Sequence, residues 1–82
     1  MTKEVLILKT PGCASCAQAT VLINKIKKEE KLKVNVKEVD ITKNPDILRR
    51  YPIMSSPGIV IDGKLEFVGV PREKELREKL NK

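Results

Sequence analysis

The protein has 82 residues, of which 17 are basic and 11 acidic, so its formal net charge at pH 7 is +6. This length is enough for one small domain, which we place at residues 1–82. The lack of histidine removes the commonest metal ligand and the usual neutral-pH base. The basic residues are interleaved with glutamates, and only Tyr51 and Phe67 could stack on bases. This pattern predicts a solvated charged surface and no nucleic-acid partner.

The first residues, MTKEVLILK, contain an apolar run that is shorter than that of a signal peptide. No stretch of the chain approaches the ~18 apolar residues of a membrane span. We therefore expect a cytoplasmic protein without a membrane partner, and we also expect it to be a monomer. In that reducing compartment a structural disulfide is disfavoured, so a pair of cysteines is expected to be catalytic or metal-binding.

Residues 4–9 form a short apolar run that is stopped by Thr-Pro-Gly at residues 10–12, which predicts a buried strand and a turn. Residues 13–30 then follow a helical period, with apolar side chains recurring every three or four positions. We expect this stripe to face the core. Its members are Cys16, Ala19, Leu22, Ile23 and Ile26.

In the second predicted strand, Val34 and Val36 share one phase of the alternation. Val39 and Ile41 follow in the opposite phase. This change of phase predicts a bulge or a strand end near residues 37–38.

A short helix is predicted next, with Asn44 as its N-cap and Pro45 as its first residue. Residues 58–61 are an apolar predicted strand, and residues 65–68 are its predicted partner, because the Asp-Gly at residues 62–63 is a strong signal for a two-residue hairpin.

The chain ends in a predicted helix that opens at residues 71–73 and buries Leu76 and Leu80. The resulting order is β-α-β-α-β-β-α. Its first βαβ unit requires a parallel pair with a right-handed crossover, and its hairpin requires an antiparallel pair. The predicted fold class is therefore α/β, with a four-stranded mixed sheet and helices on both faces.

Both cysteines lie in the stretch TPGCASCAQA, at the start of the first predicted helix. Residues three apart on a helix have Cβ atoms ~5–6 Å apart, and a disulfide needs ~3.5–4.5 Å, so a small local adjustment would open or close a Cys13–Cys16 bond. Such a short loop would stabilise the fold very little, which argues against a purely structural role.

The two sulfurs are expected to play different roles. Cys13 lies at or beside the helix N-cap, where free backbone N–H groups and the helix dipole favour a thiolate. Cys16 lies one turn further in and is expected to be more covered. We therefore predict that Cys13 attacks a substrate disulfide and that Cys16 resolves the mixed disulfide.

CxxC at a helix start, followed by SSPGIVIDGKLEF and a charged C-terminal helix, resembles the small thioredoxin/glutaredoxin-like proteins of the thioredoxin superfamily, especially the short archaeal forms. The resemblance covers essentially the whole chain. It implies a thioredoxin-like fold and a protein dithiol–disulfide oxidoreductase that needs no cofactor or metal. It also implies disulfide-containing protein substrates and an upstream thiol reductase of the thioredoxin-reductase type.

The resemblance further implies that Pro57 follows a cis peptide bond and faces the active-site disulfide. The backbone of Ser56 is then expected to pair with an extended substrate segment. Pro11 and Gly12, which precede Cys13, are expected to contact substrate as well.

The chain also departs from the patterns of these relatives. Ile7 stands six residues before Cys13, where thioredoxins bury an aspartate, so no proton relay is expected there. Residues 68–71, Val-Gly-Val-Pro, replace the glutathione clamp of glutaredoxins.

Two other functions are compatible with the cysteine pair. Two thiolates at this spacing suit a soft cation such as Cu(I), which would make the protein a metal carrier. However, metal-carrier domains place Met two residues before the first cysteine, where this chain has Pro11. The third possibility is an adaptor whose cysteines act only as a redox sensor, because a fold does not by itself assign a function.

Overall fold

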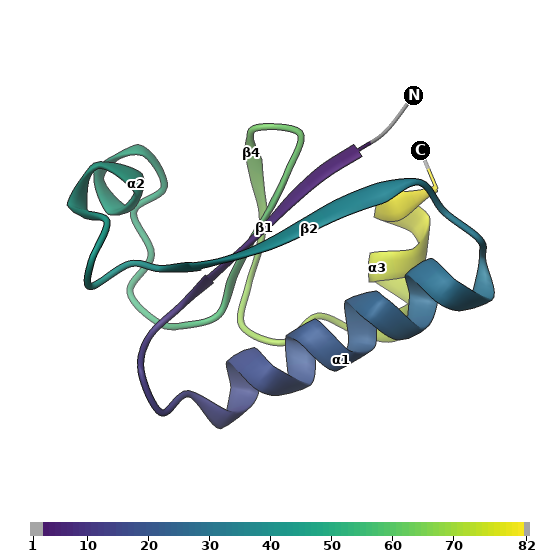
Figure 1. Cartoon of the computed structure of the whole chain (residues 1–82), viewed down its shortest axis with the longest axis horizontal. Coiled ribbons are helices and arrows are strands. Elements are labelled where there is room, and N and C mark those ends of the chain that lie inside the picture. The colour runs from purple at the N-terminus through teal and green to yellow at the C-terminus, as the bar shows by residue number, and fades with distance from the viewer. Residues whose placement is uncertain (1–2, 82) are drawn as a thin grey trace.

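The computed structural model of the protein describes residues 3–81. The chain follows the predicted order of strands and helices (Figure 1). The elements are β1 (Lys3–Lys9), α1 (Ala14–Glu29), β2 (Val34–Asp40), α2 (Pro45–Arg50), β3 (Gly58–Ile61), β4 (Lys64–Val68) and α3 (Glu73–Leu80).

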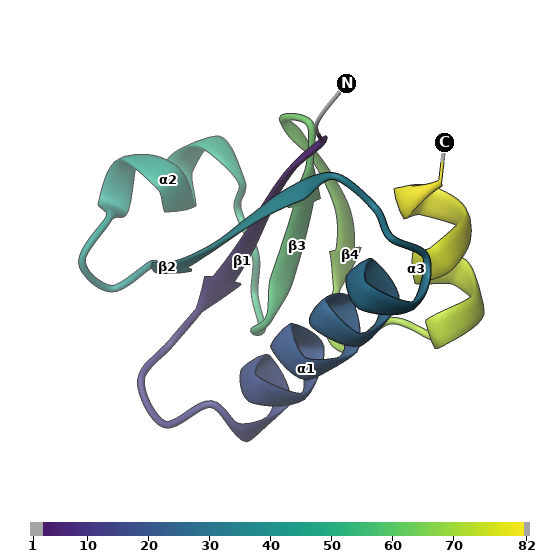
Figure 2. The same ribbon diagram turned by 45° about the vertical axis from the view of Figure 1, so that its right-hand side comes forward.

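The four strands form one mixed sheet in the order β2-β1-β3-β4, which Figure 2 shows side by side. β1 is parallel to β2 and antiparallel to β3, and β3 is antiparallel to β4. β1 therefore lies inside the sheet, and the turn that follows it starts from a strand held on both edges. The predicted α/β fold with a four-stranded mixed sheet is confirmed.

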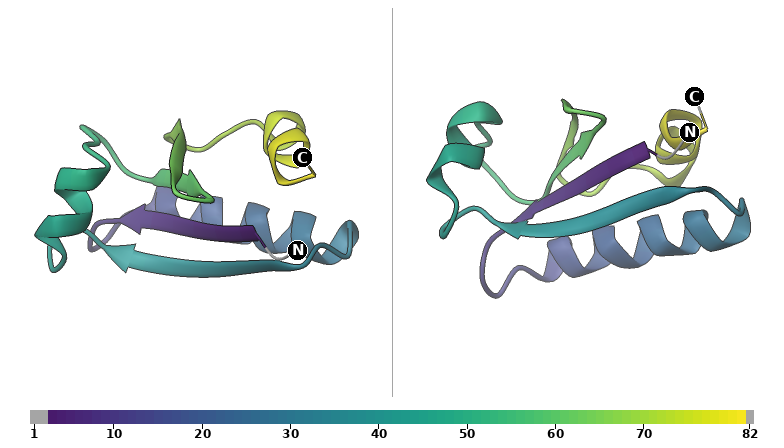
Figure 3. Two further views of the ribbon diagram at one scale, coloured as in Figure 1. Left: turned by 90° about the horizontal axis from the view of Figure 1, so that it is seen from above. Right: turned by 45° about the horizontal axis from the view of Figure 1, so that its top comes forward.

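The helices cover both faces of the sheet, as the views in Figure 3 show. On one face, α1 and α3 pack on a buried cluster that includes Val5 and Ile7 of β1. On the other face, α2 packs on a smaller cluster around Leu8 of β1 and Tyr51. Both faces of β1 are thus apolar because the sheet lies between two helical layers.

The bulge predicted near residues 37–38 is wrong. β2 pairs with β1 in unbroken parallel register over its whole length. Val34 and Val36 pack on the cluster under α1, and Val39 and Ile41 pack on the cluster under α2. The change of apolar phase therefore reflects a strand that contacts a different helical layer on each face, with no extra residue.

The irregularity of the sheet lies instead in the β3–β4 hairpin. Ile59 pairs with Phe67 and Val60 pairs with Leu65, so Glu66 is an extra residue in β4. Without this bulge, Leu65 and Phe67 would share one face. With it, Phe67 packs under α1 and Leu65 packs on the α2 side.

The hairpin turn itself is the one that the sequence predicts. Asp62 and Gly63 both have positive φ angles, 50° and 82°, as a type I′ turn requires. Asp62 also fastens the turn to the start of β1, because its backbone N–H donates to the carbonyl oxygen of Glu4 at 2.8 Å and its Oδ1 accepts from the Glu4 N–H at 2.9 Å.

Ionic contacts join α3 to the end of α1. The guanidinium of Arg77 contacts the carboxylates of Glu29, Glu73 and Glu30, which raise the pKa of Arg77 in that order of importance. These contacts, together with buried Leu76 and Leu80, hold α3 beside α1 at the far end from the cysteines.

Candidate active site

The turn after β1 presents the first cysteine at the edge of the molecule. Residues 10–12 leave the sheet, and Gly12 adopts a φ of +71°, a conformation that residues with a Cβ rarely adopt. An added Cβ at Gly12 would meet nothing within 4 Å, so the turn requires glycine for its backbone angles and not for space. Pro11 and Gly12 are both exposed and flank Cys13.

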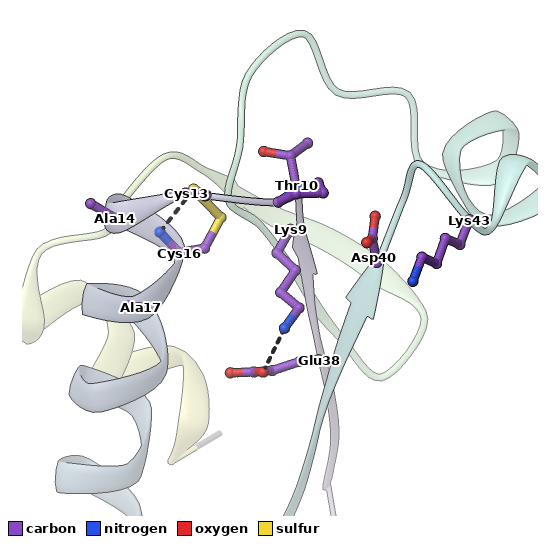
Figure 4. Close-up of a pocket in the computed structure, with 11 residues that line it drawn as sticks. Lys9, Thr10, Cys13, Ala14, Cys16, Ala17, Glu38, Asp40 and Lys43 are labelled. Carbon is purple, nitrogen blue, oxygen red and sulfur yellow. Dashed lines mark hydrogen bonds and ion pairs between the residues drawn. A yellow bond between two sulfur atoms is a disulfide. The ribbon is translucent and has the colours of Figure 1, made fainter.

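Cys13 is the N-cap of α1, at the place where the sequence predicts it. Its backbone is extended (φ −85°, ψ 104°), and its Sγ accepts a hydrogen bond from the backbone N–H of Cys16 at 3.0 Å. The sulfur thus occupies the position of a capping oxygen and satisfies one of the free donors of the first turn. Figure 4 shows this contact at the start of α1.

Cys13 and Cys16 are joined by a disulfide, with a Cα–Cα distance of 5.3 Å. The two cysteines differ in exposure. Cys13 is half-buried at the surface, whereas Cys16 is only 3% exposed and lies on the core face of α1. Opening the disulfide would therefore leave one accessible and one covered thiol.

The loop before β3 reaches the same place from a distant part of the chain. The peptide bond between Ser56 and Pro57 is cis. The Ser56 hydroxyl lies 3.4 Å from the Sγ of Cys13 and 3.1 Å from the hydroxyl of Thr10. Pro57 is buried, and its carbonyl oxygen accepts from the N–H of Gly69 at 2.7 Å, so this loop is also tied to the segment after β4.

An open cavity of about 610 Å³ lies beside the disulfide and is lined by both cysteines. Four charged side chains from β1, β2 and the turn after β2 also line it: Lys9, Glu38, Asp40 and Lys43. Glu38, Asp40 and Lys43 were not expected at the site from the sequence. The available signal was that the carboxyl ends of two parallel strands meet at one edge of a sheet.

Lys9 and Glu38 form an ion pair in this cavity, and Asp40 is hydrogen-bonded by Thr42. Glu38 accepts from the Nζ of Lys9 at 3.0 Å and from the hydroxyl of Thr20 at 2.8 Å, and Figure 4 shows the Lys9 and Glu38 side chains pointing toward each other. The hydrogen bond from Lys9, and then that from Thr20, hold the pKa of Glu38 below its usual value. Hydrogen bonds from the Thr42 hydroxyl and backbone N–H likewise lower the pKa of Asp40. Both carboxylates are therefore ionised at neutral pH.

A family model of the thioredoxin domain matches residues 1–81. The chain is also 32% identical, over 99% of its length and 95% of the relative's, to a protein of Methanothermobacter thermautotrophicus named as a probable thioredoxin. This chain belongs to the thioredoxin family.

Other comparisons agree with the thioredoxin assignment. A thioredoxin of Methanocaldococcus jannaschii is 30% identical over 96% of this chain and 93% of its own length. The crystal structure of a chloroplastic thioredoxin z superposes with a TM-score of 0.78, covering 98% of this chain and 76% of the other at 22% identity, which supports the fold alone. With its Cys13–Cys16 disulfide, this thioredoxin-family chain is a protein disulfide oxidoreductase.

Two further features of this thioredoxin-family chain concern the residues around its disulfide and the described residues as a whole. Ile7, six residues before Cys13, is fully buried in the apolar cluster under α1, and the carboxylates that line the cavity come from Glu38 and Asp40 of the neighbouring strand. Within residues 3–81, no group of three or more His, Cys, Asp or Glu side chains is placed to hold a metal ion, and no helix is long and apolar enough to cross a membrane.

The Lys9–Glu38 pair makes part of the stability of this thioredoxin-family chain dependent on pH. Because the pKa of Glu38 in the folded protein lies below its ordinary value of 4.5, its contribution is complete above that value and is lost as the pH falls through the lowered pKa. We expect the melting temperature of Glu38→Gln to fall less than that of the parent between about pH 6 and pH 3, as followed by circular dichroism.

A matched variant is Lys9→Met, which removes the main partner of Glu38 and should flatten the acid dependence in the same way. Because both side chains are partly exposed to solvent, which screens the pair, the difference in melting temperature should be small. Parallel acid profiles for the parent and Glu38→Gln would contradict this assignment.

Proposed function

We propose that the protein reduces disulfides of protein substrates, with Cys13 as the nucleophile and Cys16 as the resolving thiol. The observation that carries this proposal is the difference in exposure between the two sulfurs. Cys13 lies half-exposed at the N-cap of α1, whereas Cys16 is 3% exposed. A substrate disulfide can therefore approach Cys13 without any movement of the core, but it cannot approach Cys16.

The surroundings of Cys13 favour its ionised form. A free thiol with a pKa of ~8.5 is only a few per cent thiolate at neutral pH. Lowering the pKa to ~7 requires about 2 kcal/mol. The N–H of Cys16, which donates to the Cys13 sulfur at 3.0 Å, and the positive end of the α1 dipole both act in this direction.

The exchange proceeds in two displacements. The Cys13 thiolate attacks one sulfur of the substrate disulfide, a mixed disulfide forms, and the other substrate sulfur leaves as a thiolate. The Cys16 thiolate then attacks the Cys13 sulfur, which closes the Cys13–Cys16 bond and releases the second substrate thiolate. The substrate gains two electrons and the protein loses two. We propose that an upstream thiol reductase returns them.

The second displacement is short-range. The Cα atoms of the two cysteines are 5.3 Å apart, which lies within the usual range for disulfides. Ring closure therefore needs no change in the course of α1, and the mixed disulfide is short-lived while Cys16 is present.

Substrate would bind beside Cys13 through main-chain contacts. Within residues 3–81, the backbone N–H and C=O of Ser56 make no hydrogen bond with another backbone group, which leaves them free to pair with an extended segment. Exposed Pro11 and Gly12 directly precede Cys13 and line the same cavity, so we propose that they contact substrate as well. The cytoplasmic location expected from the sequence stays a prediction.

The mechanism is tested by trapping its intermediate. We expect reduced Cys16→Ser to accumulate a covalent complex with oxidised insulin, because the resolving thiol is gone and the mixed disulfide at Cys13 persists. The complex would be detected by intact mass spectrometry under non-reducing conditions and should dissociate on addition of dithiothreitol.

Cys13→Ser is the matched control for this experiment, because it retains only the covered thiol. It should form no complex in the time that Cys16→Ser takes to react. Equal trapping by the two variants would overturn the assignment of roles. A failure of both variants to trap substrate would favour a metal carrier or a redox sensor instead.

A further inference from the structure

Three side chains from two distant segments form a line of hydrogen bonds that ends on the Cys13 sulfur. The Thr10 hydroxyl lies 3.1 Å from the Ser56 hydroxyl, which lies 3.4 Å from the Sγ of Cys13. Thr10 belongs to the turn after β1, and Ser56 to the loop before β3. Both side chains are half-buried, so these contacts are partly shielded from water.

The direction of donation in this line follows from the disulfide. The Cys13 sulfur is bonded to Cys16 and carries no proton, so in this contact the Ser56 hydroxyl is the donor. A hydroxyl has a single proton, so Ser56 has none left for Thr10. The Thr10 hydroxyl must therefore donate to the oxygen of Ser56, and the whole line is polarised toward the sulfur.

We propose that Ser56 is a catalytic residue whose hydroxyl stabilises the Cys13 thiolate, and that Thr10 is a positioning residue that orients this hydroxyl. This inference rests on the proposed function, in which Cys13 is the nucleophile. When the disulfide is reduced, the sulfur that already accepts two hydrogen bonds, from Ser56 and from the Cys16 N–H, becomes negative. Hydrogen bonds to a charged acceptor are stronger than those to a neutral one, so both donors favour the thiolate over the thiol and over the disulfide.

This arrangement gives Ser56 two separate functions. Its backbone faces the proposed substrate strand, whereas its side chain acts on the sulfur. The side-chain function has two measurable consequences: a lower pKa for Cys13, and a reduced form that is stabilised relative to the disulfide. The second consequence makes the protein a stronger oxidant than it would be without the hydroxyl.

The proposal is tested on the full chain carrying Cys16→Ser, which leaves Cys13 as its single thiol. The rate of alkylation by iodoacetamide, measured from about pH 5 to pH 9, reports the pKa of that thiol. We expect Ser56→Ala to raise the pKa by about one unit, which corresponds to a roughly tenfold slower alkylation at pH values below both pKa values. Thr10→Val, which keeps the shape of the side chain, should raise the pKa by a smaller amount.

Two control variants separate the hydroxyl from the packing of the loop. Ser56→Thr keeps a donor at the same position and should retain a lowered pKa. Ser55→Ala removes the exposed neighbouring hydroxyl and should leave the titration of Cys13 unchanged.

A second measurement uses the protein with both cysteines intact. Equilibration with mixtures of reduced and oxidised dithiothreitol gives the reduction potential. We expect Ser56→Ala to make it more negative, by up to about 30 mV for a tenfold change in the equilibrium constant.

An unchanged pKa and potential in Ser56→Ala would overturn the proposal. Should Ser56→Ala not fold, Thr10→Val decides: a raised pKa supports the proposal, and an unchanged one overturns it. The proposed function fails in a different way, through activity that persists in Cys13→Ser. The two failures are therefore distinguishable.

Discussion

Replacing Cys13 with serine should reduce the dithiothreitol-dependent reduction of insulin to the uncatalysed rate. The serine hydroxyl does not ionise near neutral pH, and oxygen cannot form the mixed disulfide, so both displacements are lost. The rate is followed by the turbidity of the precipitating insulin B chain. Because serine is itself a favoured N-cap residue, α1 should still begin at the same place, and the circular dichroism spectrum should match that of the parent.

The control for this experiment is Ser55→Ala, an exposed position in the loop before Ser56, which should keep the parental rate. Insulin reduction by Cys13→Ser at the rate of the parent would show that Cys13 is not the nucleophile. Loss of activity together with loss of the folded spectrum would instead call for Cys13→Ala, whose fold and activity would then be compared in the same assay.

Replacing Ile23 with alanine should produce the largest loss of stability. Ile23 lies in the middle of α1, is fully buried, and packs on the cluster that joins this helix to the sheet and to α3. Removing its branched side chain leaves a cavity, which we expect to lower the free energy of unfolding by about 3 kcal/mol. In a domain of this size that corresponds to a fall in the melting temperature of roughly 15 °C.

Val21→Ala on the same helix is the matched control. Val21 is 67% exposed, so its truncation should change the free energy of unfolding by less than about 0.5 kcal/mol. Chemical denaturation of the parent and of both variants gives the three free energies of unfolding, and the slope of the free energy with denaturant concentration is taken to be that of the parent. Equal destabilisation at the two positions would contradict the division of α1 into a core face and a solvent face.

Much of the fold follows from local patterns in the sequence. The short apolar run before residues 10–12, the Asn44-Pro45 helix start and the Asp62-Gly63 turn each depend on neighbouring residues, and all three appear in the structure where they are predicted. Such signals are reliable because turn residues and helix-start residues act through their own backbone angles, and α2 begins at Pro45 although the Asn44 side chain makes no capping hydrogen bond.

Local patterns were less informative about strands whose two faces contact different helices. The two apolar phases of β2 suggested a bulge, yet they arise because Val36 and Val39 face different helices. The actual bulge at Glu66 leaves no mark in the alternating run Leu65-Glu66-Phe67. In both cases the placement of α2 opposite α1 decides which side of the sheet an apolar residue can use, and this placement is not encoded in any one segment.

The sequence by itself determined the redox pair: Gly12 ends the turn, Cys13 caps the helix, and Cys16 follows one turn later on the buried face, all within five residues. Only the tertiary structure decided what surrounds that pair. Ser56 reaches the Cys13 sulfur across 43 positions of sequence, and Glu38 meets Lys9 across 29. The family resemblance placed the loop of Ser56 near the disulfide, but these side-chain contacts depend on the order and register of the strands, which arise from packing of the whole sheet between its helices, so no local run of residues could have predicted them.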